Sequence, residues 1–235
     1  MKTLALAIVC ALAMTGAVFA QGTVVWNFIT PGSMTAETNT TQGSPVFGGG
    51  SEGGGTVGPI APGVSGATYN FELLYNTSFT GSQAPAPGFA SLFGGTWLDT
   101  GLTATNSNTA GRLAPVNPNS AAVVPWANGV TNNIMLVGWS ANLGTSWATV
   151  SNELATGSFN FILSPVFFGE SATGYLTPLS PGTNPGATVF GSGPSPQGLP
   201  IFSLNTQLYV IIPEPGTIAL VALGGLSLLL FRRRK

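Results

Sequence analysis

The chain has 235 residues, a formal net charge of −1 and only 6% charged residues, against roughly 25% in an ordinary globular domain. It contains 33 glycines and 18 prolines, and both residue types disrupt helix interiors. This composition is typical of an extracellular all-β protein or of a partly disordered one. The scarcity of basic residues argues against nucleic acid as a partner, because binding to phosphates depends on lysine and arginine.

Residues 1–20 have the pattern of a secretory signal peptide. Lys2 supplies the positive end, an apolar run follows, and Val18 and Ala20 place small residues before Gln21. We therefore expect a signal helix, export through the Sec machinery and cleavage between Ala20 and Gln21. The only cysteine, Cys10, lies in this segment, so we expect no disulfide in the mature chain.

Residues 21–212 form one expected domain without helices, since no stretch shows sustained helical spacing of apolar residues. Stretches rich in β-branched and aromatic residues, or with alternating polarity, predict strands at 23–29, 68–75, 134–140, 158–163 and 204–212. In the second, Tyr69, Phe71 and Leu73 are expected on one face and Asn70 and Glu72 on the polar face. Long loops rich in glycine and proline separate these strands, at 43–66, 83–88 and 177–200.

Strands without intervening helices favour an antiparallel β-sandwich. The sequence leaves a jelly roll and an immunoglobulin-like arrangement open.

Catalytic chemistry is hard to assemble in this domain. Residues 21–212 contain no histidine, lysine or cysteine, so the usual bases and nucleophile partners are missing. A carboxylate pair for glycoside hydrolysis would have to come from Glu72, Asp99, Glu153 and Glu170, and no spacing singles out a pair. We expect no catalytic residue, no metal site and no cofactor, with a glycoside-active enzyme kept as an alternative.

Tryptophans offer the domain's other candidate chemistry. Trp26 and Trp139 lie in apolar strands and are expected in the core. Trp97, Trp126 and Trp147 lie nearer turn-like segments. An exposed indole can stack on a sugar ring, so these three are the candidate ligand-stacking residues, against the alternative that they pack in the core.

The tail, residues 213–235, has three parts. Pro213, Glu214 and Pro215 form a short extended segment because proline fixes φ and restricts the residue before it. Residues 217–231 are free of charge and predict a short transmembrane helix of about 22 Å. Arg232, Arg233, Arg234 and Lys235 then predict a cytoplasmic end by the positive-inside rule. The domain would stand outside the inner membrane.

The Pro-Glu-Pro motif, the apolar helix and the terminal basic cluster, with a signal peptide at the other end, resemble the PEP-CTERM sorting signal of Gram-negative bacteria. Gly216-Thr217 stands where Ser-Thr is commoner. The resemblance implies recognition and processing at or near the motif by exosortase, and a role in surface matrix or exopolysaccharide. The stretch Ala20 to Asn27, AQGTVVWN, also resembles the mature start of a group of PEP-CTERM proteins with no assigned activity.

We therefore expect an exported, noncatalytic surface or extracellular-matrix protein, anchored and sorted through its tail. Its expected partners are an exosortase-type enzyme, the Sec machinery and the inner membrane, with exopolysaccharide as a further candidate. The alternative is a carbohydrate-binding module or adhesin that uses exposed aromatics.

Overall fold

The computed structural model describes residues 21–26, 35–43, 57–59, 69–88, 92–106, 112–116, 121–159, 166–183, 186–191, 193–201 and 205–211. Its strands are β1 (Gln21–Val25), β2 (Thr35–Gly43), β3 (Val57–Pro59), β4 (Tyr69–Asn76), β5 (Leu98–Asn106), β6 (Leu113–Pro115), β7 (Ala122–Ala127), β8 (Asn132–Ser140), β9 (Val166–Glu170), β10 (Gly174–Leu176), β11 (Ala187–Thr188), β12 (Gly198–Leu199) and β13 (Asn205–Ile211). The helical elements described are a short 3-10 turn, η1 (Ala141–Leu143), and the helix α3 (Trp147–Thr156).

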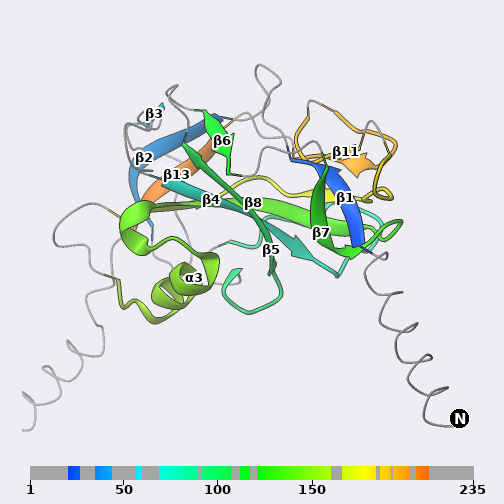
Figure 1. The fold of residues 1–235 in the computed structure, drawn as a ribbon. Coiled ribbons are helices and arrows are strands. Elements are labelled where there is room, and N and C mark those ends of the chain that lie inside the picture. Colours follow the sequence, from blue (N-terminus) through cyan, green and yellow to red (C-terminus); the bar gives the residue numbers. More distant parts are fainter. Residues whose placement is uncertain are drawn as a thin grey trace, which may run out of the picture.

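Most of these strands belong to one large curled sheet (Figure 1). Its order is β3-β2-β13-β9-β8-β4-β5-β6, and β10 adds to it by pairing with both β8 and β12. The pairs are antiparallel except β2 with β13, which run parallel. This parallel pair brings a strand near the start of the described chain beside the last one.

A three-stranded sheet, β11-β1-β7, lies over one face of the large sheet. Within it β1 pairs parallel with β11 and antiparallel with β7. One apolar core joins the two sheets: Val24, Trp26 and Val124 from the small sheet pack with Phe71 and Leu136 from the large one. The large sheet is thus covered on this face by strands.

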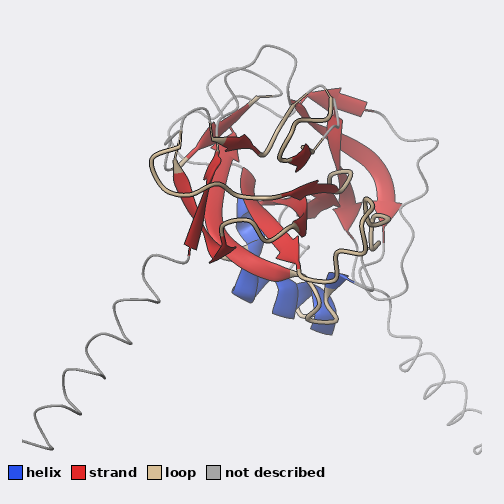
Figure 2. Cartoon of the chain, turned by 90° about the vertical axis from the view of Figure 1, so that its right-hand side faces the viewer, coloured by secondary structure: helices blue, strands red, loops and turns tan. Residues whose placement is uncertain are grey.

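The opposite face of the large sheet is covered by α3, which Figure 2 shows as the helical layer beside the strands. A second apolar core lies there and contains Met135, Val137 and Trp139 of β8 with Val150 and Leu154 of α3. β8 is therefore buried along its whole length, because its alternate side chains enter two different cores.

The helix α3 corrects the expectation that residues 21–212 contain none. Ser146 accepts a hydrogen bond from the Thr149 amide (3.4 Å) and caps its start, and Gly157 ends it in the left-handed conformation at φ 65°. Trp147, Val150 and Leu154 form its buried face. Apolar residues at this spacing between Ser146 and Gly157 are a helix signal. The helix is only ten residues long, so the signal in the sequence is short.

The strand predictions are confirmed at 68–75, 134–140 and 204–212, where β4, β8 and β13 lie. The first strand covers 21–25, with 27–29 outside the described residues. The predicted strand at 158–163 is not seen at its described start: Ser158 and Phe159 follow α3 as irregular backbone. At the coarser level the mostly-β prediction is confirmed, although the two parallel pairs depart from a purely antiparallel arrangement.

Candidate functional site

The three tryptophans predicted to stack on a ligand are buried. Trp97, Trp126 and Trp147 are 5%, 7% and 6% exposed. Trp126 stacks on Tyr75 with ring centroids 4.9 Å apart, and Trp147 stacks on Phe168 at 6.1 Å. Their burial supports the alternative that they pack in the core and not the ligand-stacking one: Trp126 lies in β7 and joins the first core, whereas Trp147 begins α3 and packs with Trp97 in the second.

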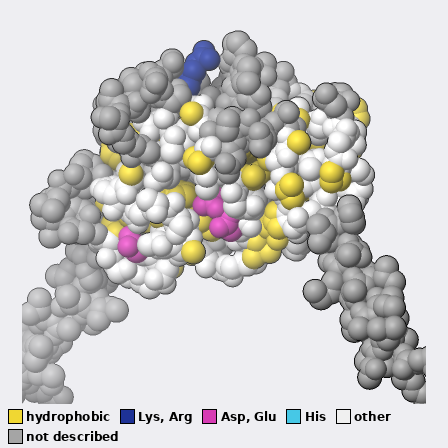
Figure 3. Space-filling view, in the orientation of Figure 1, with side chains coloured by type: hydrophobic (Ala, Val, Ile, Leu, Met, Phe, Trp, Pro, Cys, Tyr) yellow, Lys and Arg dark blue, Asp and Glu magenta, His cyan; other side chains and the backbone are white. Residues whose placement is uncertain are grey.

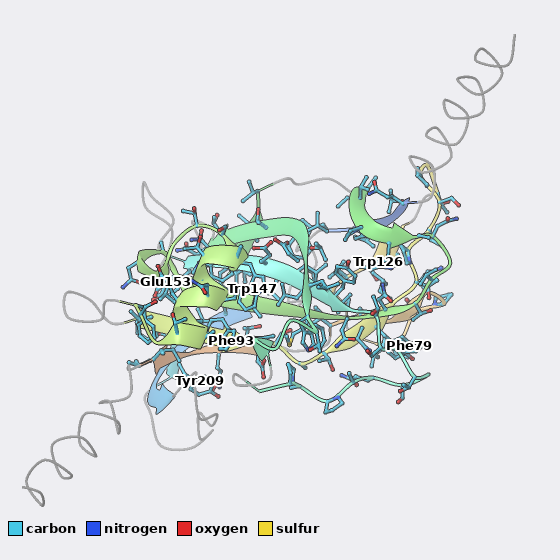
Figure 4. All side chains as sticks on the ribbon, turned by 90° about the horizontal axis from the view of Figure 1, so that it is seen from below. Phe79, Phe93, Trp126, Trp147, Glu153 and Tyr209 are labelled. Atoms are coloured by element: carbon cyan, nitrogen blue, oxygen red, sulfur yellow. The ribbon has the colours of Figure 1, made fainter. Side chains whose placement is uncertain are left out.

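Figure 4 shows Trp147 with Phe93 near α3, and Trp126 with Phe79 at the other end of the sheet. Phe79 and Tyr175 are only partly buried, and their ring centroids lie 4.9 Å apart. The turn before Phe79 is closed by the Ser78 amide, which donates to Asn76 Oδ1 (2.7 Å). This aromatic pair was missed in the sequence, because Phe79 and Tyr175 are 96 positions apart, Phe79 in a loop and Tyr175 in the three-residue strand β10.

Glu72 is the one carboxyl among the described residues that is fully buried, at 2% exposed. Its neighbour across β8 is Val137, and a bulge interrupts its pairing with β5 just before Leu74. The carboxyl accepts the Trp147 amide on Oε2 (3.2 Å), and the Asp99 carboxyl lies near enough to influence its pKa. The expected polar face of β4 is thus not open to solvent: it lies under α3.

Burial raises the pKa of Glu72 to about 9, with a further contribution from the nearby Asp99 carboxyl. The Trp147 amide acts in the opposite sense. The raised pKa favours the protonated form of the Glu72 carboxyl at neutral pH. Figure 3 shows only a few acidic side chains (magenta) on this face, with a basic side chain (dark blue) at its upper edge.

Glu170 lies on the same face as Glu72 but two strands away, on β9. Val137 of the intervening strand β8 pairs with Glu72 on one side and with Glu170 on the other. Its Oε1 accepts the Gly88 amide (3.1 Å), while Oε2 is buried with no hydrogen-bond partner. Burial raises its pKa to about 7, and the Gly88 amide opposes this. The same loop makes a second contact with the large sheet four residues earlier, where the Ala84 amide donates to Asn133 Oδ1 (3.3 Å).

These carboxyls bear on the glycosidase alternative. Glu72 is only 2% exposed, whereas the carboxyls of a glycosidase flank a bound sugar and stand roughly 5–10 Å apart to accommodate it. Sequence spacing could not reveal that Asp99 lies near Glu72. In the β4–β5 ladder Glu72 pairs with Thr103, and the register shift that follows places Asp99 opposite Leu74. Within the described residues, no three His, Cys, Asp or Glu side chains gather as a metal site would require.

The predicted sorting residues lie outside the described part of the chain: Pro213, Glu214, Pro215, Arg232, Arg233, Arg234 and Lys235, as does Ala20 at the signal cleavage position. Gln21 is the exposed first residue of β1. At the other end the described part of the chain closes with β13, whose last residue, Ile211, is buried. Among the described helices none has the length and apolar character needed to span a bilayer, and the predicted transmembrane helix at 217–231 is not among them.

Comparison with known protein families matches residues 212–235 to the PEP-CTERM protein-sorting motif. The chain carries a PEP-CTERM sorting signal. The match spans the three parts recognised in the sequence: the Pro-Glu-Pro segment, the apolar stretch and the basic end. No curated protein and no solved structure matches the chain.

A PEP-CTERM signal implies export, association with the membrane during sorting and processing by an exosortase-type enzyme on the way to the cell surface. The functional site with an assigned role is therefore the tail. The domain that the tail delivers is the part whose chemistry has to be inferred from its own residues.

Proposed function

We propose that this PEP-CTERM protein is a noncatalytic component of the cell surface or extracellular matrix, and that its C-terminal signal directs it there. The sorting motif at 212–235 carries the proposal. The domain adds support, because its polarity comes mainly from uncharged residues, and amide and hydroxyl groups pair readily with sugar hydroxyls. Exopolysaccharide is accordingly the proposed surrounding partner.

The test of the sorting role is a triple substitution, Pro213→Ala, Glu214→Ala and Pro215→Ala, in a host that carries the sorting enzyme. A plain anchor needs only apolar length and terminal cations, so the variant would then be located like the wild type. A sorting signal needs the motif itself. We expect the variant to accumulate at full length in the inner membrane and to disappear from the surface fraction.

A matched control distinguishes recognition from anchoring. Deleting residues 232–235 leaves the Pro-Glu-Pro segment intact and removes the cations that oppose translocation, which cost about 2.5–3.5 kcal/mol each at the centre of a membrane helix. We expect this variant to pass into the periplasm instead of stalling in the membrane. Surface delivery of the alanine variant at the wild-type level would disprove the sorting role.

A second candidate function is carbohydrate binding, and the Phe79–Tyr175 pair is the observation that favours it. Two partly exposed rings 4.9 Å apart give an apolar surface on which the C–H face of a sugar can pack. Binding of exopolysaccharide from the host should fall at least about tenfold in a Phe79→Ala, Tyr175→Ala variant, since stacked aromatic anchors dominate such interfaces. The control is Leu98→Ala, which removes an exposed apolar side chain elsewhere.

A further inference from the structure

The turn that joins β7 of the small sheet to β8 of the large one contains the only Asn-Gly pair of the chain. The turn is closed by the Val130 amide, which donates to the Ala127 carbonyl oxygen (3.3 Å). Asn128 and Gly129 between them are both exposed. Gly129 has a φ of 76°, which glycine adopts without steric cost, so the turn favours glycine directly after Asn128.

This pair of residues can react with itself. Glycine has no side chain, so nothing hinders the approach of the Gly129 nitrogen to the carboxamide carbon of Asn128. In the reaction Gly129 N loses its proton and bonds to Asn128 Cγ, the Cγ–Nδ2 bond breaks, and the amide nitrogen leaves with that proton as ammonia. Water then opens the cyclic imide at either carbonyl, Gly129 N regains a proton, and residue 128 becomes an aspartate or an isoaspartate. The only reactant besides the chain is water.

Residues 178–180 hold both reacting groups in the folded domain. The Gly129 amide donates to the Pro178 carbonyl oxygen (3.1 Å), which disfavours loss of the proton from the attacking nitrogen. Asn128 Nδ2 donates to Ser180 Oγ (2.7 Å), which ties the carboxamide to the neighbouring segment. Both hydrogen bonds have to break before the Gly129 nitrogen can attack.

The holding segment is itself fixed to the start of β1. Leu179 and Thr23 exchange two main-chain hydrogen bonds (2.8 and 3.1 Å), and Thr23 Oγ1 also donates to the Leu179 carbonyl oxygen (3.2 Å). Pro178 is buried against Gly22, where an added Cβ would lie 2.5 Å from the proline ring and 3.3 Å from Asn128 Cα. The turn, the segment and the start of β1 therefore pack as one unit, and the two restraining bonds have a firm base.

We propose that Asn128 is a site of spontaneous deamidation, and that its hydrogen bonds and those of Gly129 to residues 178–180 make the reaction slow in the folded protein. Either product places a carboxylate on the exposed turn, and this group cannot donate to Ser180 Oγ as the amide does. The isoaspartate also lengthens the main chain by one atom where the two sheets are joined. The modification thus changes both the charge and the contacts of this turn.

The test is peptide mapping by mass spectrometry of the full chain in mild detergent. The protein is kept in neutral buffer and sampled over time, with a parallel sample in concentrated urea. The aspartyl and isoaspartyl peptides differ from the amide in mass and separate from each other by chromatography. In the folded chain we expect conversion at Asn128 to be at least about tenfold slower than in urea, since two hydrogen bonds must break. Equal rates, or no conversion at Asn128 in urea, would overturn the proposal.

Ser180→Ala removes the acceptor of the Asn128 side chain and leaves the Gly129–Pro178 hydrogen bond in place. Conversion in the folded variant should be about threefold faster than in the wild type, whereas the rate in urea should not change. Ser82→Ala is the matched control, because it removes an exposed serine hydroxyl from another loop, and it should convert like the wild type. If Ser180→Ala converts no faster than Ser82→Ala, residues 178–180 do not restrain the turn and the proposal is wrong.

Discussion

Gly138 and Gly169 face each other across β8 and β9, and each leaves space that a neighbour fills. A Cβ at Gly138 would lie 2.4 Å from the Phe71 ring, and one at Gly169 would lie 2.0 Å from the Gln207 carbonyl oxygen of β13. The first neighbour is a side chain and the second is backbone. These glycines therefore set how closely β13 and the Phe71 ring approach the centre of the large sheet.

Gly169→Ala should destabilise the domain by about 1–3 kcal/mol or more, because an overpacked strand can relieve the contact only by moving β13. Urea unfolding measures the change. Gly193→Ala is the control, since no atom lies within 4 Å of its added Cβ, and it should behave like the wild type. Equal stability of the two variants would show that β13 does not pack on β9 as described.

Glu170 gives a second residue-scale prediction. Its pKa is raised to about 7 by burial, so the folded state binds the proton more tightly than the unfolded state. The stabilisation is complete below the unfolded pKa near 4.5 and is lost as the pH rises through about 7. The melting temperature of the wild type should therefore fall between about pH 5 and about pH 8.

In Glu170→Gln that fall should be smaller, because the amide does not ionise. Glu153→Gln should keep the wild-type slope. A melting temperature that rises with pH over this interval in the wild type would contradict the buried, partly unpaired position of Glu170.

At the scale of elements, α3 shows what the sequence could and could not predict. The strands β4, β8 and β13 were predictable because β-branched and aromatic runs are strong local signals. α3 was missed because its apolar face consists of three residues, Trp147, Val150 and Leu154, and its stability comes from packing on the sheet instead of from propensity. The burial of Glu72 was missed for the same reason: only the helix on the sheet turns an expected solvent face into a core.

Ser146→Ala should lower the stability of the domain by about 1 kcal/mol, since it removes the side chain that accepts the Thr149 amide. Chemical denaturation is the measurement. Ser151→Ala, on the same helix, is the control and should be neutral or slightly stabilising because alanine is the better helix former. If both variants lose the same stability, the helix does not begin at Ser146.

At the scale of the whole molecule, the C-terminal tail and the β-rich domain have separate roles. The tail carries a sorting signal that the sequence alone reveals, because recognition of an extended motif, an apolar stretch and a basic end needs no tertiary structure. The domain is held together by two cores on either side of one curled sheet, and its aromatic residues serve mainly those cores. The proximity of Glu72 and Asp99 and the Phe79–Tyr175 pair emerge only from the folded arrangement, since each joins residues far apart in the chain.

The central claim is that the tail is a substrate of an exosortase-type enzyme, and intact mass spectrometry of the protein from its own host tests it most directly. The protein is isolated from the surface fraction of cells with the sorting enzyme and from the membrane of cells without it. We expect the surface form to begin at Gln21 and to have been cut at or near residues 213–215, and the form from cells without the enzyme to retain residues 216–235. A surface form that carries the complete tail, with the same mass in both strains, would contradict the account.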